Sequence, residues 1–523
     1  MSADATGPAP RVPSVRPEAA PAVVPQRRGG HAAAPMRAPI ALSKTKLLSL
    51  KQCRRKLWLE TYRPELVPEP SPEKDALLAT GNTVGEIARR LYGPGHLVSF
   101  ERGLRAAIET TRNLVAAGGR EPIFEATFEH DGVSVAVDVL DRSEPKPKLV
   151  EVKSAAHVKE HHLDDCAIQA WALARNGLAP RAVAVATVDP EFVYPGGGDY
   201  EGLLVETDVT EEANERLNDV DALVAAARST LADLDEPAVL VGTHCGAPYD
   251  CELYQHCAPP QGAYPVLGLG GSKEKLYELM HSGYRDLRDV PESLLANETQ
   301  RLVWRQSRSE LPYVGAELRA LARELAFPRY YLDFETVSSA VPIFAGTRPF
   351  EALPFQWSCH IETSRGRLEH AEFLDLSPEP PMRRLAERLL ETLGTAGPIV
   401  VYTPYERRVI GELAERFGEL AAALGALAER IVDLHPPTRR HYYHPAMQGS
   451  WSLKAVLPTV APDLSYASLG EVRDGFAAQT AYFEAVEART PDARRAELRR
   501  ALLEYCRQDT LALARLVEFF GRD

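Results

Sequence analysis

The stretch Tyr331-Leu-Asp-Phe-Glu-Thr336 predicts a strand with two acids on one side. Alternate side chains of a strand point to opposite faces, so Asp333 and Glu335 share one face while Leu332 and Phe334 share the other. Two carboxylates held this close repel each other unless a cation lies between them. Oxygen ligands suit Mg²⁺ or Mn²⁺ better than Zn²⁺. For an isolated Asp-x-Glu, an edge strand with a solvated acidic face is the simpler interpretation.

A helix near the end of the chain offers a third acid. In Tyr505-Cys-Arg-Gln-Asp509 the tyrosine and the aspartate are four residues apart and therefore share one helix face. Between the two motifs the sequence predicts strands over 354–361, 368–374 and 398–402 and a helix over 404–417. Along the chain, the Asp-x-Glu strand is therefore followed by three strands, a helix and the final helix.

An Asp-x-Glu strand followed by a late Tyr-x-x-x-Asp helix resembles the DEDD exonucleases, the DnaQ-like branch of the ribonuclease H fold, in its tyrosine subtype. The resemblance implies cleavage inward from a 3′ end with two bound cations. The residues that would hold these cations are Asp333, Glu335 and Asp509. Tyr505 would orient the attacking water.

The third acid of this family departs from the expected type. The family has an aspartate after an aromatic residue at the start of a helix, and here Glu406 follows Tyr405. Glu406, with its longer side chain, or Asp433 could supply the ligand. A simple loop position is an equally good interpretation of Asp433.

The composition is that of a globular protein with two or three domains. The chain has 523 residues, of which 45% are hydrophobic and 25% charged. The formal charge of −13 argues against a generally basic coat, but not against a nuclease, because metal-site carboxylates add negative charge. No apolar run is long enough for a membrane helix. With seven cysteines and no signal peptide recognised, we expect reduced or metal-bound thiols in a cytoplasm.

Four segments are predicted along the chain. They are a disordered Ala/Pro/Arg-rich tail over 1–40, a first folded domain over 41–260, a helical linker over 261–325 and a second folded domain over 326–523. The glycine-rich stretch 262–271 lacks the Gly-Lys-Ser/Thr order of a phosphate loop, so no nucleotide-driven motor is expected in this chain.

The first domain contains a second group of charged residues. Strands are predicted over 124–130 and 133–140, joined by a turn at Asp131-Gly132, and over 148–154. Asp138 lies late in its strand, while Glu151 and Lys153 share a face of the next one. Acids of this kind bind divalent cations, and a lysine beside them can stabilise a charged phosphate. A charged face of a β-meander is the alternative.

The residues around this group resemble the PD-(D/E)xK nucleases of the RecB and CRISPR-associated adaptation types over roughly 42–260. The matching segments are Val137-Asp-Val-Leu140, Leu149-Val-Glu-Val-Lys-Ser154 and Asp165-Cys-Ala-Ile-Gln169. The resemblance implies catalytic roles for Asp138, Glu151 and Lys153, with Gln169 in the place of the family's helix glutamine. The upstream histidine of the family is missing here; Glu86 could replace it, or the site could use fewer ligands.

Four cysteines give a further resemblance. A helix is predicted over 42–58 with Ser43 as its cap, and it carries Cys53 followed by three basic residues. One early cysteine and the three late ones, Cys245, Cys251 and Cys257, resemble the [4Fe–4S] pattern of iron–sulfur nucleases of this class, although the late spacing differs. A zinc site and unligated thiols are the alternatives. The remaining three, Cys166, Cys359 and Cys506, are predicted to be packing residues.

The whole arrangement resembles a bacterial family known as domain of unknown function 2779. It implies an α/β fold, with a restriction-endonuclease-like first domain and a ribonuclease H-like second domain whose mixed sheet is flanked by helices. The implied function is a two-site, metal-dependent nuclease acting on nucleic acid, DNA rather than RNA, with a helicase or repair or defence proteins as partners. The alternative is a catalytically decayed nucleic-acid-binding or scaffold protein. Glu406 and the missing histidine favour this alternative, whereas Lys153 and Tyr505 favour activity.

Overall fold

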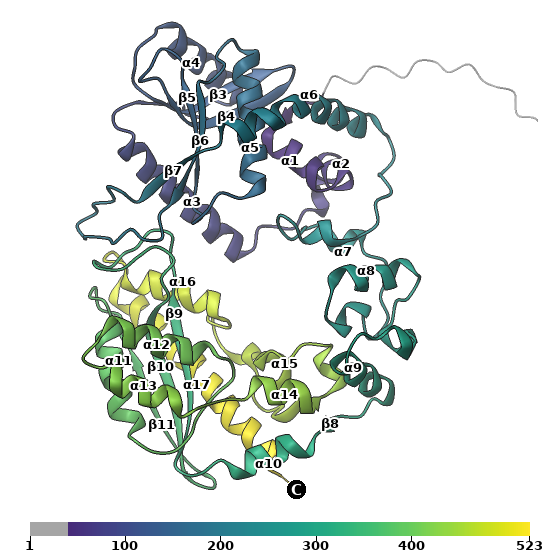
Figure 1. Cartoon of the computed structure of the whole chain (residues 1–523), viewed down its shortest axis with the longest axis vertical. Helices are drawn as coiled ribbons and strands as arrows, with labels where there is room; N and C mark the ends of the chain where they lie inside the picture. Colours follow the sequence, from purple (N-terminus) through teal and green to yellow (C-terminus); the bar gives the residue numbers. More distant parts are fainter. Residues whose placement is uncertain (1–39, 523) are drawn as a thin grey trace, which may run out of the picture. The chain divides into compact units, whose positions relative to one another are not determined.

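The computed structural model describes residues 40–522. The predicted tail, except for its last residue, lies outside the described residues. From Ala41 onward the chain forms one compact unit, and its subdivision at 260 and 325 stays a prediction. The described residues build a mixed α/β structure with 17 α-helices and three sheets (Figure 1).

The first sheet is built mainly from the first half of the chain. Its strands are β1 (Leu42–Ser43), β2 (His96–Leu97), β3 (Ile123–His130), β4 (Val133–Asp141), β5 (Lys148–Lys153), β6 (Ala182–Val188) and β7 (Leu204–Asp208). Their order is β2-β3-β4-β5-β6-β7, with β1 alongside β4. The predicted β3–β4 hairpin is confirmed, since both turn residues have positive φ, 50° at Asp131 and 70° at Gly132. Only β1–β4, β2–β3 and β5–β6 among these described strands pair in parallel.

Ten helices of the described chain precede the second sheet in sequence, and the first five alternate with the strands of the first sheet. They are α1 (Lys44–Gln52), α2 (Arg54–Tyr62), α3 (Pro72–Leu91), α4 (Leu104–Ala116), α5 (Glu160–Arg175), α6 (Thr210–Ala232), α7 (Tyr254–Cys257), α8 (Lys273–His281), α9 (Glu298–Ser309) and α10 (Ala316–Glu324). α5 connects the parallel strands β5 and β6, as a crossover helix does.

The prediction of a single helix over 42–58 was wrong, because the chain forms two helices there, α1 and α2. Ser43 caps α1 as predicted, accepting a hydrogen bond from the backbone N–H of Lys46 at 3.3 Å. Cys53 then takes an extended conformation, with φ −166° and ψ 126°, before α2 begins. The helical spacing of apolar residues continues across this break, so the pattern alone could not reveal it.

The second sheet has the order β11-β10-β9-β12-β13. Its strands are β9 (Arg329–Val337), β10 (Leu353–Ser364), β11 (Arg367–Leu374), β12 (Ile399–Val401) and β13 (Ile431–Asp433). β9, β10 and β11 are antiparallel neighbours, while β12 and β13 continue the sheet in parallel with β9. The strands predicted over 331–336, 354–361, 368–374 and 398–402 are thereby confirmed. β8 (Tyr313–Val314) and β14 (Tyr442–Tyr443) form a separate small sheet.

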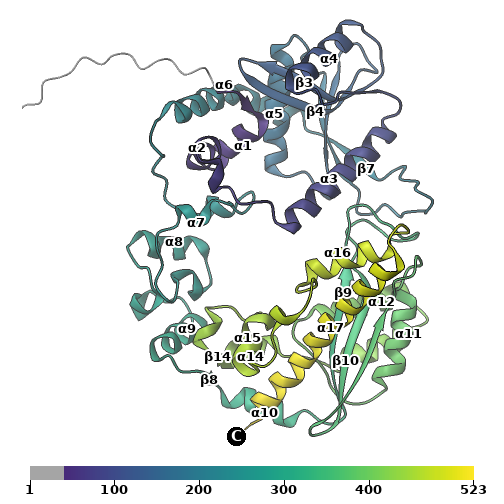
Figure 2. The same ribbon diagram turned by 180° about the vertical axis from the view of Figure 1, so that it is seen from behind.

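Helices cover both faces of this second sheet. They are α11 (Met382–Leu393), α12 (Tyr405–Arg416), α13 (Ala421–Glu429), α14 (His435–His441), α15 (Leu453–Val460), α16 (Gly475–Val486) and α17 (Asp492–Phe520). Figure 1 shows α11, α12 and α13 over one face, and Figure 2, from behind, shows α17 crossing the other. Leu332 and Phe334 are buried in the same core as residues of α11, α12 and α13. The alternate residues of β9 therefore face α17.

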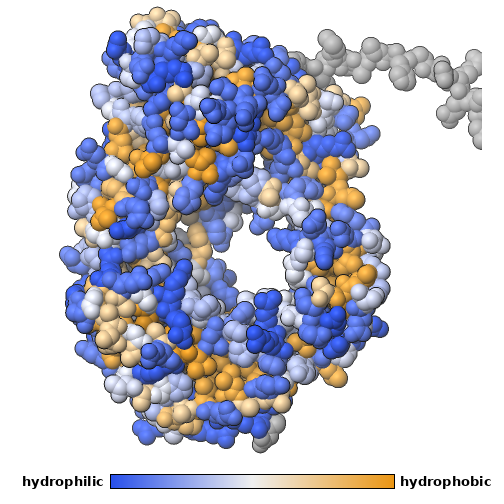
Figure 3. Space-filling model, viewed as in Figure 1, coloured by the Kyte–Doolittle hydropathy of each residue, from blue (hydrophilic) through white to orange (hydrophobic). Residues whose placement is uncertain are grey.

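The surface is mixed in character. Hydrophilic residues cover most of the face seen in Figure 3, with smaller hydrophobic patches between them. Within residues 40–522 no helix has the length and apolar character needed to span a membrane. Even α17, the longest of them, carries charged residues along its length.

Candidate metal centres

Two acids of β9 and a cysteine of α17 form a tight group. Asp333, Glu335 and Cys506 each offer a ligand atom, and these atoms all lie within 4.8 Å of one another. The Cys506 Sγ is 3.5 Å from Asp333 Oδ2. Glu335 and Cys506 are buried and Asp333 is partly buried. The prediction that both acids share one strand face is confirmed, and that face is turned toward α17.

Asp509 lies beside this group, and its Oδ1 accepts a hydrogen bond from the Tyr466 hydroxyl. Burial, and after it the charge of Asp509, raises the pKa of both Asp333 and Glu335 well above their usual range. Tyr505 lies one turn earlier on α17 and is buried, and its pKa is raised by burial and then by Asp509. The predicted face of the final helix thus meets the acidic face of β9.

The buried carboxylates of this group would be stabilised by a nearby positive charge. Burial raises the pKa of Asp509 to about 6 and that of Glu406 to about 7. Each carboxylate is disfavoured in its ionised form because water is excluded and, for Asp333, Glu335 and Glu406, because other carboxylates are near. A divalent cation among them would offset both effects, since it would be the largest local charge.

The two candidates for the third acid differ in position. Glu406 lies in the first turn of α12 and is only 4% exposed. Its charge raises the pKa of Asp333 and Glu335, although less than burial and the charge of Asp509 do. Asp433 instead accepts a hydrogen bond from the backbone N–H of His435 at 2.8 Å, at the start of α14. Its charge acts on Glu406. Of the two acids, Glu406 is the one whose charge acts on both strand acids, which favours it as the third ligand.

Three residues of this site escaped the sequence analysis. Lys454 Nζ lies 5.5 Å from the ring centroids of both Tyr466 and Tyr505, and its charge lowers the pKa of Glu335 and Asp509 against the effect of burial. Tyr466 begins a short 3₁₀ helix, Tyr466–Ser468, which has no periodic pattern that could have marked it. Cys506 is buried, as predicted for a packing residue, but its contact with Asp333 depends on how α17 is rotated against β9.

Three acids lie in a row across the first sheet. Phe124 pairs with Val139, which in turn pairs with Val150. Continued by one residue, the β4–β5 register places Asp138 across from Glu151. Glu125 has a positive φ of 55°, which departs from strand geometry, and it lines one pocket with Asp138.

A pocket of about 300 Å³ opens beside this row. Glu86 and Arg89 of α3 line it together with Glu125 and Asp138. Glu86, the predicted substitute for the missing histidine, is thus brought to the same pocket as Asp138. Glu125 was missed, because its positive φ of 55° breaks the regular alternation of β3.

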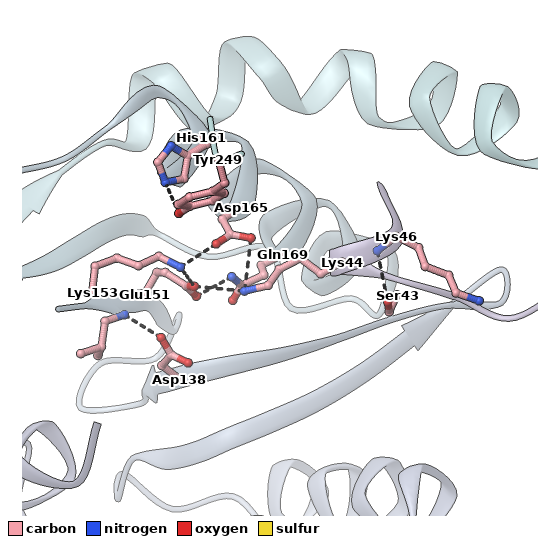
Figure 4. Close-up of polar contacts among 11 residues, drawn as sticks. Ser43, Lys44, Lys46, Asp138, Glu151, Lys153, His161, Asp165, Gln169 and Tyr249 are labelled. Atoms are coloured by element: carbon pink, nitrogen blue, oxygen red, sulfur yellow. Dashed lines mark hydrogen bonds and ion pairs between the residues drawn. The ribbon is translucent and has the colours of Figure 1, made fainter. Parts of the chain in front are cut away.

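Two lysines and a glutamine hold the acid of β5 (Figure 4). The Lys153 ammonium donates to Glu151 Oε1 and to Asp165 Oδ2, both at 2.6 Å. Lys44, the first residue of α1, lies 3.0 Å from Glu151 Oε1 and 3.3 Å from Asp165 Oδ1. The Gln169 amide donates to Glu151 Oε2 at 2.5 Å. Glu151, Lys153 and Gln169 are brought together as predicted, and Lys44 and Asp165 are additions.

The acids of this site differ in their electrostatics. Burial alone would raise the pKa of Glu151, but the ammonium groups of Lys44 and Lys153 hold it below its usual range. Burial, followed by the charge of Glu151, raises the pKa of Asp138 to about 8. Asp138 Oδ2 accepts a hydrogen bond from the backbone N–H of Val152 at 2.7 Å. Lys44 and Lys153 contact Glu151 directly, whereas only the charge of Lys44 acts on Asp138, so a cation in the pocket would stabilise ionised Asp138.

The four predicted cysteines line one small cavity between α2, α7 and the loop before α7. They are Cys53, Cys245, Cys251 and Cys257, all partly buried. Burial, with the neighbouring thiols adding to it, raises the pKa of Cys257 to about 11. Tetrahedral zinc at about 2.3 Å from each sulfur would place the sulfurs about 3.8 Å apart. Four thiols around one cavity could hold either a zinc ion or an iron–sulfur cluster.

A polar network beside Asp509 leads to a prediction about pH. Ser358 contacts His370 at 2.9 Å, and His360 contacts Thr510 of α17 at 2.8 Å. Burial lowers the pKa of His360 to about 3 and that of His370 to about 4, below the value of about 6.5 in an unfolded chain. Between pH 6.5 and 4 these histidines bind protons in the unfolded chain but stay neutral in the folded state. The free energy of unfolding therefore decreases as the pH falls.

We therefore expect His370→Gln to weaken the fall of the Tm between pH 7 and pH 4, measured by thermal unfolding in EDTA. His157→Gln, at an exposed position, is the matched control and should leave the wild-type pH dependence unchanged. An equal pH dependence in wild type and His370→Gln would contradict this account.

Part of the chain matches a known protein family. Residues 330–452 match the family described as domain of unknown function (DUF2779). This segment begins in β9 and ends just before α15, so it includes Asp333, Glu335 and Glu406 but not Asp509. No match to the chain was found among curated proteins.

Proposed function

We propose that the protein is a metal-dependent nuclease with two separate sites for hydrolysis of phosphodiester bonds. The observation that carries the proposal is the meeting of the β9 acids with Asp509 and Tyr505 of α17, from opposite ends of the second half of the chain. Buried carboxylates without a counter-ion are costly unless a cation joins them. DNA is the preferred substrate in this proposal, and RNA the alternative.

The second site would belong to a ribonuclease H-like domain of the DEDD exonuclease type. Three antiparallel strands followed by two parallel ones, with helices on both faces, support this assignment. Mg²⁺ or Mn²⁺ bound there would supply the Lewis acidity that phosphodiester hydrolysis needs. The residues that would hold the cations are Asp333, Glu335, Glu406 and Asp509. Tyr505 would orient the attacking water, and Lys454 would offset charge on the scissile phosphate.

The first site would belong to a PD-(D/E)xK nuclease domain. Asp138 and Glu151 would hold the cation, with Glu125 and Glu86 as further oxygen donors from the pocket. Lys153, which Glu151 and Asp165 hold in place, would stabilise charge developing on the phosphate. Gln169 would position Glu151 through its hydrogen bond.

A second candidate function is nucleic-acid binding without catalysis at the first site. One observation favours it: both oxygens of Glu151 already accept hydrogen bonds, Oε1 from Lys44 and Lys153 and Oε2 from Gln169. These donors use three of the about four lone-pair sites of the carboxylate, so a cation at Glu151 would compete with them. Activity at the first site and activity at the second therefore have to be tested separately.

The cysteine cavity would hold a [4Fe–4S] cluster that ties the beginning of the first domain to its end. We expect the protein purified without air to be brown and to absorb visible light. Cys251→Ala should lose this absorbance and the bound iron, whereas Cys166→Ala removes a thiol outside the cavity and should keep both. A colourless wild-type protein that carries zinc would contradict the cluster.

The experiment that tests the function uses single- and double-stranded DNA and RNA labelled at either end. The purified protein is incubated with each substrate and with Mg²⁺, Mn²⁺ or EDTA. Metal-dependent cleavage, including stepwise shortening from the 3′ end, is expected. Absence of cleavage of every substrate with both metals would overturn the proposal and leave the binding function as the better account.

A further inference from the structure

A pocket of about 910 Å³ lies on the side of α17 away from Asp509. It is bounded by the start of β9, the β10–β11 turn and the C-terminal part of α17. Among the described residues, five arginines line it: Arg323, Arg329, Arg365, Arg515 and Arg522. Its volume is near the upper end of ligand pockets, which span about 300–1,000 Å³. Neither proposed metal centre contributes a side chain to its lining.

The acids of this pocket are already neutralised. Glu362 Oε2 accepts from Arg329 Nε at 2.7 Å, and Glu362 Oε1 accepts from the backbone N–H of Gly366 at 3.0 Å. Both members of the Glu362–Arg329 pair are buried, so the pair forms a fixed floor. Glu518 faces two arginines, Arg522 at 2.9 Å and Arg515 at 3.4 Å.

The surplus charge of the pocket is positive. Arg365, at the β10–β11 turn, is exposed and makes no hydrogen bond or ion pair with any residue in the described part of the chain. Leaving Arg323 aside, because it is engaged with the C-terminal segment, the described lining carries four guanidinium groups and two carboxylates. In a chain whose formal charge is −13, such a concentration of arginine indicates an anionic ligand.

Exposed apolar side chains accompany these arginines. Phe327 is 42% exposed and Leu368 is 38% exposed, and both line the pocket. The Arg329 guanidinium lies 4.5 Å from the Phe327 ring centroid. An exposed aromatic ring beside arginines is the combination that binds single-stranded nucleic acid, because the ring stacks on a base while the arginines bind phosphates.

We propose that this pocket binds a nucleotide unit of single-stranded nucleic acid, with Phe327 stacking on a base and Arg365 on a phosphate. This proposal rests on the proposed function, because the bound strand is taken to be the substrate of the second site. Along α17, Arg515 lies six residues beyond Asp509, which corresponds to about 9 Å at the rise of a helix. The pocket would hold part of the strand that is not being cut and thereby keep the enzyme on its substrate.

Fluorescence anisotropy with a labelled oligothymidylate, in EDTA so that nothing is cleaved, tests this proposal. We expect Phe327→Ala to raise the Kd about tenfold, the loss typical of one stacked base. Arg365→Ala should raise it several-fold and reduce the slope of log Kd against log salt by about 0.7, the contribution of one phosphate contact on a single strand. Arg367→Ala, exposed on the same hairpin but outside the pocket, is the matched control and should bind as wild type does.

The outcomes separate this proposal from the nuclease proposal. If Phe327→Ala and Arg365→Ala both bind the oligonucleotide with wild-type affinity and have unchanged Tm values, the proposed binding in this pocket is wrong, even if Asp333→Asn abolishes cleavage. Loss of affinity in both variants supports the pocket even if no substrate is ever cut. Thymidine monophosphate is added as a competitor: if it displaces the oligonucleotide at equal concentration, the ligand is a free nucleotide and the proposed strand is wrong.

Discussion

Asp333→Asn is expected to lower cleavage from the 3′ end at least about 100-fold, since removing a mere supporting partner of a metal ligand already costs about 10- to 100-fold. The substitution keeps the shape of the side chain but removes a charge that the proposed cation needs. It also relieves repulsion among buried acids, because burial and the charges of Asp509, Glu335 and Glu406 all disfavour ionised Asp333. In EDTA the variant should therefore unfold at the wild-type Tm or above it.

Addition of Mn²⁺ separates loss of the ligand from loss of the fold. The wild-type Tm should rise with Mn²⁺, because a ligand that binds only the folded state stabilises it, and Asp333→Asn should show a smaller rise. Glu369→Gln, at an exposed position on β11, is the control and should keep both activity and the Mn²⁺ response. Full activity in Asp333→Asn would show that the acidic group of β9 is not catalytic.

Lys153→Met is expected to abolish cleavage at the first site and leave the second unchanged. The Lys153 ammonium is bound by two carboxylates, those of Glu151 and Asp165, and without it only Lys44 remains near both. Loss of a lysine that stabilises the transition state costs about 100-fold or more. A strand whose 3′ end is blocked reports the first site alone, and a strand with a free 3′ end reports both.

The control for this variant lies on the same strand. Lys148 is also on β5 but pairs with Glu206, at 2.7 Å, outside the acidic group. Lys148→Met should keep cleavage of the blocked strand. Breaking a buried ion pair costs about 3–5 kcal/mol, so the Tm of Lys153→Met is measured as well. Retained cleavage from the free 3′ end would prove the fold intact, and equal cleavage of the blocked strand by Lys153→Met and wild type would refute the assignment.

Local patterns in the sequence predicted the elements that carry most site residues. The alternation around Asp333 and the Asp131-Gly132 turn each depend on a few neighbouring residues, and the strands and the hairpin formed as expected. The four-residue spacing of Tyr505 and Asp509 likewise fixed their common helix face. Such signals are local because backbone geometry alone sets the periods of strands and helices.

What the sequence could not predict depends on contacts between distant segments. Lys44 reaches Glu151 across 107 positions of the chain. Tyr466 contacts Asp509 from a short 3₁₀ helix without a periodic pattern. The break at Cys53 could not be predicted either, because the apolar spacing of a helix continues through it. In the structure, Cys53 lines one cavity with the three late cysteines.

The most direct measurement of the central claim, that acids from distant segments form two divalent-cation sites, is anomalous diffraction from crystals soaked in Mn²⁺. We predict one group of peaks among Asp333, Glu335 and Asp509 and another beside Asp138 and Glu151. Asp333→Asn should remove only the first group. Crystals that show no manganese at either place, at concentrations that support cleavage, would contradict the account.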